Sequence, residues 1–87
     1  MVRQNMETKI VIVIEGGLVQ EVIANAAVEL LTLDHDIEGG AQEYIREIPQ
    51  GDSPPIRCYV RFEHVTRDAP QVARLWKAAS EERNRPV

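Results

Sequence analysis

The sequence predicts an α+β fold, in which a small antiparallel β-sheet of about four strands carries a C-terminal amphipathic helix on one face. Three observations predict this class. Residues 10–14 are five consecutive β-branched apolar residues that precede Gly16 and Gly17, a pattern typical of a buried strand entering a tight turn. Residues 56–63 alternate between apolar and polar side chains, as a strand with one core face does. Residues 69–83 repeat apolar side chains at helical spacing.

The two glycines predict an N-terminal β-hairpin, because glycine adopts positive φ at both central positions of a type I′ turn without steric cost. In the register that this turn implies, Ile14 faces Val19 and Ile12 faces Glu21. Both faces of the hairpin are then largely apolar. Since an isolated hairpin is marginal in water, we expect both faces to be covered.

A third strand is predicted over residues 28–33, which would extend the hairpin into a meander. A helix over 19–33 is the competing interpretation, because the apolar residues of this range also fit helical spacing. Residues 41–48 fit either a short helix or a strand, and both interpretations stay open. Residues 50–55 have the composition of a stiff loop, with two prolines at its end.

The strand over 56–63 places Cys58 on the core face together with Ile56, Val60 and Phe62. For the C-terminal helix, Asp68 is the expected N-cap, with Gln71 completing a capping box and Pro70 in the first turn. The apolar stripe of this helix comprises Val72, Leu75, Trp76 and Ala79. Trp76 would either fill the small core or, if exposed, mark an interface.

The chain of 87 residues predicts one α+β domain over 9–83, a flexible arm over 1–8 and a frayed end over 84–87. One cysteine excludes an internal disulfide, and no apolar run has the length of a membrane span or a signal peptide. We therefore expect a cytoplasmic protein without membrane association.

The net charge of −4 is unevenly distributed along the chain. Residues 1–52 hold ten acids and three bases, whereas 53–87 hold four acids and seven bases. The two halves could pack beside each other, or the acidic half could face a basic protein partner. The second apolar face of the sheet, which includes Val11, Val13 and Val22, has no second helix to cover it. This predicts a homodimer that buries either that face or an edge strand.

No residue cluster has the spacing of a catalytic or cofactor-binding motif. Asp34, His35, Asp36 and Glu38 have metal-ligand side chains, but in an extended chain the imidazole points away from the carboxylates. We interpret them as a solvated strand end and predict no metal site. Arg57, Tyr59 and Arg61 combine charge with an aromatic ring, as single-strand nucleic-acid platforms do, but the acidic composition argues against this partner.

The leading functional hypothesis is therefore a non-catalytic protein–protein interaction module that self-associates and presents an acidic region to a partner. The predicted partner-binding residues are Asp34, Asp36, Glu38, Glu43, Glu47, Arg57, Tyr59 and Arg61. Two alternatives remain open: an acidic inhibitor, encoded by a mobile element, of a host nucleic-acid-binding enzyme, and a small metal-dependent enzyme that uses the carboxylates near His35.

The segments IEGGLVQEVIA and LTLDHDIEG resemble the opening of short uncharacterised proteins from bacterial genomes and mobile elements. In those proteins a GG-x-VQ-x-V hairpin precedes a strand that ends in Asp-x-Asp. The resemblance covers residues 10–39 and implies β structure in a bacterial, cytosolic setting. It implies no activity and assigns no role to a particular residue.

Overall fold

The computed structural model describes residues 7–86, which form two sheets of three strands each and one C-terminal helix, so the α+β class is confirmed. In chain order the elements are β1 (Ile10–Glu15), β2 (Leu18–Ala24), β3 (Leu30–Asp34), the 3₁₀ helix η1 (Gln42–Tyr44), β4 (Ile45–Gln50), β5 (Ser53–Glu63), β6 (Thr66–Arg67) and α1 (Ala69–Arg83). They belong to two compact units. The terminal unit comprises the described residues of Met1–Val28 and His64–Val87, and the middle unit comprises Glu29–Glu63.

The N-terminal hairpin forms at the predicted place in the terminal unit. Strands β1 and β2 pair antiparallel and are joined through Gly16 and Gly17, whose φ angles are 59° and 76°. Both angles lie in the left-handed region that glycine adopts without strain. Beside the turn, Ile14 faces Val19 as the sequence predicts.

A β-bulge makes the predicted register wrong farther from the turn. The pairing shifts between Val13 and Ile14, so Ile12 faces Val22 and not Glu21. Glu21 instead lies opposite Val13. Because opposite residues share a face, the side of the hairpin that carries Ile12 is apolar where the predicted register had placed a carboxylate.

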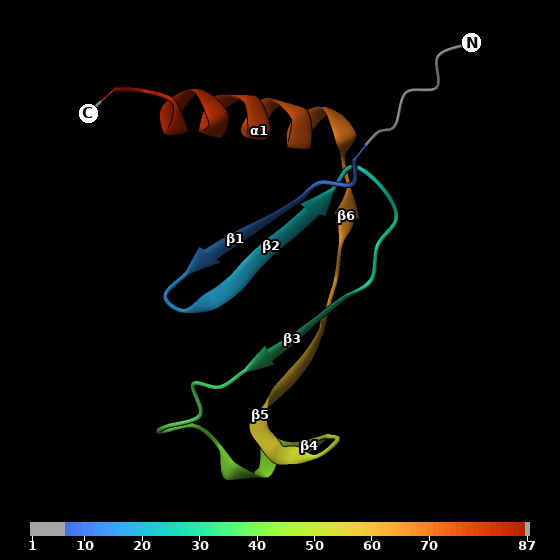
Figure 1. Ribbon diagram of the computed structural model, residues 1–87, viewed down its shortest axis with the longest axis vertical. Coiled ribbons are helices and arrows are strands. Elements are labelled where there is room, and N and C mark those ends of the chain that lie inside the picture. The colour runs from blue at the N-terminus through green and yellow to red at the C-terminus, as the bar shows by residue number, and fades with distance from the viewer. Residues whose placement is uncertain (1–6, 87) are drawn as a thin grey trace. The chain divides into compact units, whose positions relative to one another are not determined.

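Helix α1 spans the predicted residues and lies against β1 and β2 (Figure 1). The Asp68 carboxylate accepts a hydrogen bond from the backbone N–H of Gln71 at 3.1 Å, and Pro70 lies in the first turn. The capping box does not form, because the Gln71 side chain accepts from Arg74. The N–H of Asp68 donates to the carbonyl of Ala24 at 2.9 Å, which joins the helix start to the end of β2, where β6 pairs in parallel.

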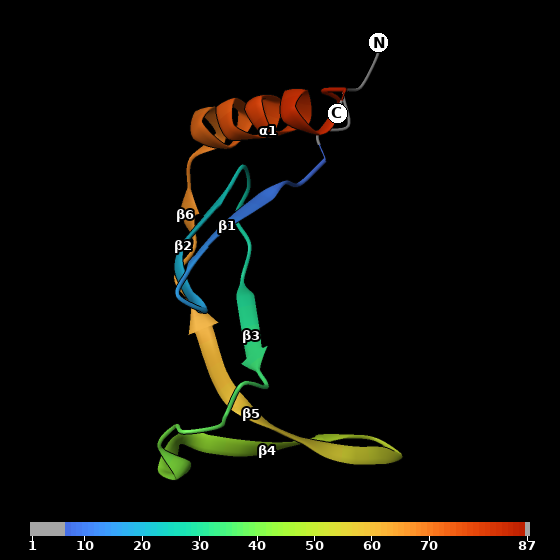
Figure 2. The same cartoon turned by 90° about the vertical axis from the view of Figure 1, so that its left-hand side faces the viewer.

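The predicted meander is wrong, because β3 does not join the β1–β2 hairpin. It pairs antiparallel with the second half of β5, from Leu30 opposite Glu63 to Asp34 opposite Tyr59. The competing helix is also wrong, since β2 and β3 occupy its range. Strand β4 pairs with the first half of β5, up to Ile45 opposite Tyr59, so β5 changes neighbours at Tyr59 (Figure 2).

The range left open between helix and strand, 41–48, contains both, because η1 is followed directly by β4. The stiff loop predicted over 50–55 is wrong. Only Gly51 and Asp52 form the turn, and β5 begins at Ser53. Pro54 and Pro55 are tolerated in β5 because they come before the stretch that pairs with β3. On that edge of β5 no backbone N–H is needed at these two positions.

Each unit has a small core among the described residues. Val22, Ile23 and Ala24 of β2 are buried in the terminal unit together with Val72 of α1. In the middle unit only Cys58 is buried, as predicted for the core side of its strand. A sheet with so little buried surface has little hydrophobic stabilisation of its own.

The predicted single domain over 9–83 divides into these two units. Of the predicted arm, residues 1–6 lie outside the described residues. Glu7 is described, and its carbonyl accepts a hydrogen bond from the side-chain amide of Asn25 at 3.0 Å. The same side chain accepts from the N–H of Lys9 at 2.8 Å, which holds the chain at the start of β1.

The predicted frayed end, 84–87, still hydrogen-bonds to the helix at its first two residues. The N–H of Asn84 donates to the carbonyl of Ser80 at 3.1 Å, and the N–H of Arg85 donates to that of Glu82 at 3.2 Å. The last residue of the chain lies outside the described residues.

Candidate functional site

The end of the middle-unit sheet formed by β3 and β5 has two chemically different faces. Directly opposite residues on antiparallel strands point to the same face, so the pairing register assigns each side chain. The polar face comprises Thr32, Asp34, Tyr59, Arg61 and Glu63, with Leu30 opposite Glu63 at its end. The apolar face comprises Leu31, Leu33, Val60 and Phe62.

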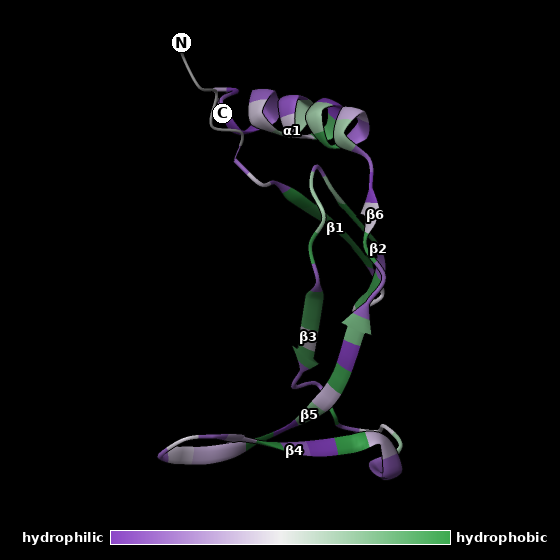
Figure 3. Ribbon diagram, turned by 90° about the vertical axis from the view of Figure 1, so that its right-hand side faces the viewer, coloured by the Kyte–Doolittle hydropathy of each residue, from purple (hydrophilic) through white to green (hydrophobic). Residues whose placement is uncertain are grey.

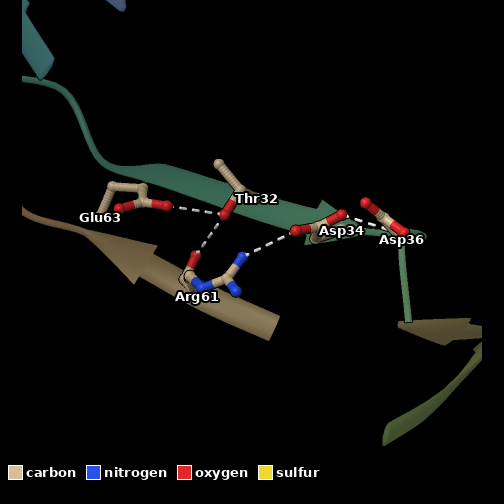
Figure 4. A network of polar contacts seen from close by, with 5 residues as sticks. All are labelled: Thr32, Asp34, Asp36, Arg61 and Glu63. Atoms are coloured by element: carbon tan, nitrogen blue, oxygen red, sulfur yellow. Dashed lines mark hydrogen bonds and ion pairs between the residues drawn. The ribbon is translucent and has the colours of Figure 1, made fainter. Parts of the chain in front are cut away.

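A network of hydrogen bonds connects the polar face (Figure 4). Arg61 Nη1 donates to Asp34 Oδ2 at 3.2 Å, and the backbone N–H of Asp36 donates to Asp34 Oδ1 at 2.9 Å. The Thr32 hydroxyl donates to Glu63 Oε2 at 2.8 Å. The guanidinium of Arg61 also lies 5.5 Å from the centroid of the Tyr59 ring, within cation–π range. The network therefore joins β3 to β5 through the Thr32–Glu63 and Asp34–Arg61 contacts, and joins Asp34 to Asp36 in the segment after β3.

The Asp34 carboxylate is stabilised in its ionised form. The backbone N–H of Asp36 and the guanidinium of Arg61 hold the pKa of Asp34 below its ordinary value of 3.8. Because each carboxylate oxygen already accepts a hydrogen bond, Asp34 fixes the geometry of this face and has no proton to donate at neutral pH. This environment favours a structural role over general acid–base chemistry.

The structure brings together some of the eight predicted partner-binding residues and separates others. Asp34, Tyr59 and Arg61 meet on the polar face, and their side chains are only partly exposed. Glu47 lies opposite Arg57 across β4 and β5, on the same side of β5 as Tyr59. The remaining three predicted residues, all exposed, lie in the segment between β3 and β4: Asp36, Glu38 and Glu43.

The charges on this side of β5 are mixed. A cation faces a carboxylate at Arg61 and Asp34, and again at Arg57 and Glu47. The contiguous acidic surface that the inhibitor hypothesis requires is therefore interrupted by two guanidinium groups. The exposed carboxylates of the β3–β4 segment remain an acidic surface beside it.

A hollow of about 840 Å³ lies beside this network in the middle unit. Its lining includes the predicted residues Glu47, Tyr59 and Arg61, and two residues that the sequence interpretation missed, Tyr44 and Arg46. Arg46 Nη1 donates to the carbonyl of Glu43 at 2.8 Å, which fixes one wall. Only the pairing of β4 with β5 brings these residues to one place, so no local sequence pattern marks them.

Tyr59 is positioned by a close approach to a glycine. A Cβ atom added to Gly40 would overlap the Tyr59 hydroxyl oxygen, so the ring lies directly against the backbone of the β3–β4 segment. The same ring receives the guanidinium of Arg61. Glycine at position 40 therefore permits the contact between this segment and the sheet.

Among residues 7–86, no group of three or more histidine, cysteine, aspartate or glutamate side chains is placed to hold a metal ion. Both oxygens of the Asp34 carboxylate already accept hydrogen bonds, one from Arg61 and one from the N–H of Asp36. The geometry consequently gives no support to the metal-dependent enzyme hypothesis.

The apolar face of the middle unit is open (Figure 3 shows β3 as an apolar strand). Phe62 is 83% exposed, and its cross-strand partner Leu31 is 50% exposed. Leu33 is also exposed, at 36%. The sequence predicts correctly that Phe62 points to the apolar side, and within the middle unit no residue covers that side chain.

The terminal unit contains a second apolar surface, a groove between β1 and α1 with a volume of about 560 Å³. Leu75 and Trp76 form part of its helical wall. Trp76 is 41% exposed, which makes it a wall of the groove and not a core residue. Lys9 Nζ lies 5.6 Å from the centroid of its ring.

Comparison with protein-family models, with curated proteins and with solved structures finds no match for this chain. The resemblance to short bacterial and mobile-element proteins thus stays a prediction. None of the helices in the described part of the chain is long and apolar enough to cross a membrane.

Proposed function

We propose that this chain is a non-catalytic protein–protein interaction module that self-associates through the apolar face of its middle unit. The observation that carries the proposal is the exposure of Phe62, which lies directly opposite Leu31 on the paired strands β5 and β3. One aromatic and two leucine side chains on an exposed sheet face resemble the apolar centre of a protein–protein interface.

A second copy of this chain is the occupant that fits this face. The apolar face has no charged residue, so it can pack against an identical face without burying an unpaired charge. Two sheets that pack face to face lie about 10 Å apart and interdigitate the side chains of their inner faces. Dimerisation would thereby give the middle unit, in which Cys58 alone is buried, a two-layered core.

The energetics indicate a dimer that depends on concentration. Complete burial of a large apolar side chain contributes about 1.5 to 3 kcal/mol, so the exposed parts of Phe62, Leu31 and Leu33 contribute roughly 3 to 5 kcal/mol per copy. The two copies together then gain about 6 to 10 kcal/mol, which is similar to the cost of association, about 4 to 15 kcal/mol. Phe62 contributes the largest part of this burial free energy, so it decides whether the burial exceeds the cost of association.

The polar side of the sheet and the acidic segment beside it are the surfaces left for a partner. Asp36, Glu38 and Glu43 are exposed, and their carboxylates make no ion pair with a described residue. They support binding of a protein with a basic surface, at a rate that falls with ionic strength. The inhibitor hypothesis remains the alternative for this surface.

Sedimentation velocity over a range of concentrations tests the self-association. We expect the wild type to shift from monomer to dimer as its concentration rises, and Phe62→Ser to weaken the dimer by roughly 1000-fold, because two copies each lose about 2 kcal/mol. Since Phe62 is so exposed, the variant should keep the circular dichroism spectrum of the wild type.

Leu18→Ser is the matched control, because Leu18 is an exposed apolar residue of the terminal unit. It should leave the dimer unchanged. A wild type that stays monomeric at millimolar concentration would refute the proposal, as would a loss of association that is equal in both variants.

A further inference from the structure

The groove of the terminal unit opens along the outer edge of β1. Its lining includes four consecutive residues of this strand, Ile10, Val11, Ile12 and Val13. Consecutive side chains of a strand point to opposite faces, so a hollow that touches all four of them follows the strand's edge. No residue of β2 lines the groove, which places it on the side of β1 that faces away from β2.

This edge has free backbone hydrogen-bonding groups. Strand β1 is the outermost strand of its sheet, in the order β1–β2–β6. Within the described part of the chain, the backbone of residues 10–14 bonds only to β2. An edge strand with unpaired N–H and C=O groups is a template for a further strand.

The charged residues that line the groove and an adjoining hollow are all cationic. Arg83 lines the groove itself, and Lys9 and Lys77 line an adjoining hollow that shares Trp76 as a wall. No acidic side chain lines either hollow. Along the helix, Trp76 and Arg83 are separated by about 10 Å at 1.5 Å per residue, so the cations stand toward the two ends of the groove.

We propose that this groove binds an extended, apolar peptide segment of a partner protein that carries carboxylate groups. The peptide adds to β1 as a further strand, its apolar side chains lie between β1 and α1, and its carboxylates meet Arg83 at one end and Lys9 and Lys77 at the other. A strand rises about 3.3 Å per residue, so carboxylates four residues apart are separated by about 13 Å and reach both cationic ends. This binding site is independent of the proposed dimer, since the groove and the apolar face belong to different units.

Trp76 is the only tryptophan of the chain and forms part of the groove wall, so its fluorescence reports occupation directly. The wild-type protein is titrated at low ionic strength with the peptide Gly-Glu-Thr-Val-Thr-Glu-Gly, in which the valine and both glutamates share one face of the strand. We expect a saturable blue shift of the emission, because the peptide removes water from a ring that is 41% exposed. Absence of a shift up to millimolar peptide would overturn the proposal.

Two control peptides separate the two kinds of recognition. The glutamine analogue Gly-Gln-Thr-Val-Thr-Gln-Gly keeps the strand but lacks the carboxylates, and should bind at least threefold more weakly. The proline analogue Gly-Glu-Thr-Pro-Thr-Glu-Gly keeps the charges and an apolar central residue but lacks the central N–H, and should lose most of its binding. Equal binding of all three peptides would show that neither charge nor strand pairing operates.

The protein variant Arg83→Gln should reduce the affinity for the glutamate peptide by about threefold to fivefold, and should not change it for the glutamine peptide. Arg74→Gln is the matched control, because Arg74 lies on the same helix, bonds to Gln71 and does not line the groove. An equal loss in both variants would indicate a non-specific charge effect and overturn the assignment. A Trp76 blue shift that develops with protein concentration alone would assign the edge to a second copy and overturn it as well.

Discussion

The ionised carboxylate of Asp34 connects β3 to β5 on the polar face through its ion pair with Arg61. Its folded-state pKa lies below the ordinary value of 3.8, so its carboxylate stabilises the fold at pH values above about 3.8. This contribution is lost as the pH falls below that value toward the folded-state pKa. At neutral pH, Asp34→Asn should lower the free energy of unfolding by up to about 1 kcal/mol, the range of a partly exposed ion pair.

Urea unfolding at pH 6 and at pH 3 measures this difference. The gap between wild type and Asp34→Asn should be present at pH 6 and shrink at pH 3, where the Asp34 carboxylate of the unfolded chain is mostly protonated and unfolding is thereby favoured. Asp52→Asn is the control, since the exposed Asp52 side chain forms no hydrogen bond or ion pair with a described residue. A gap that is the same at both pH values would contradict an electrostatic role for Asp34.

Single residues also show what a sequence can and cannot predict. Alternation along residues 56–63 correctly predicts which side of the strand Cys58, Tyr59 and Phe62 occupy. Whether a side is covered depends on groups far away in the chain or in another molecule. Cys58 is therefore buried and Phe62 exposed, although both belong to the same predicted face. The contact of Asp34 with a partner stays a prediction, and within the chain its carboxylate accepts a hydrogen bond from Arg61.

Helix α1 depends on its N-cap. The Asp68 carboxylate satisfies the N–H of Gln71, one of the donors that a helix start leaves without an intrahelical partner. Asp68→Ala should lower the free energy of unfolding by about 0.5 to 2 kcal/mol, measured by urea denaturation. Asp68→Ser keeps an acceptor and should recover most of that loss, so two variants of equal stability would contradict the capping role.

At the scale of elements, local chemistry predicts which segments are strands or helices, and the pairing of distant segments is not predicted. The turn at Gly16 and Gly17 and the helix start at Asp68 depend on the local chemistry of these residues, so the sequence predicts both. The pairing of β3 with β5 joins residues about 30 positions apart, and no local pattern encodes it. The bulge beside Ile14 is likewise not predicted from the sequence, because it depends on how β1 and β2 pair and twist.

The whole molecule combines two units that each leave apolar surface exposed. The terminal unit has a groove along the free edge of β1, and the middle unit has the apolar face around Phe62. The sequence predicts an uncovered apolar face that includes Val11 and Val13 of the groove, but it predicts neither the groove beside α1 nor the exposure of Phe62. Small chains bury a limited fraction of their surface, and assembly with other chains is one way to increase it.

The most direct test of this account is an isotope-filtered nuclear Overhauser experiment on an equal mixture of ¹³C-labelled and unlabelled wild-type protein, at a concentration where the dimer predominates. We expect cross-peaks from the Phe62 ring of one copy to the methyl groups of Leu31 and Leu33 of the other, because two apolar faces pack against each other. A dimer whose intermolecular cross-peaks omit Phe62 and arise elsewhere in the chain would contradict dimerisation through the apolar face of the middle unit.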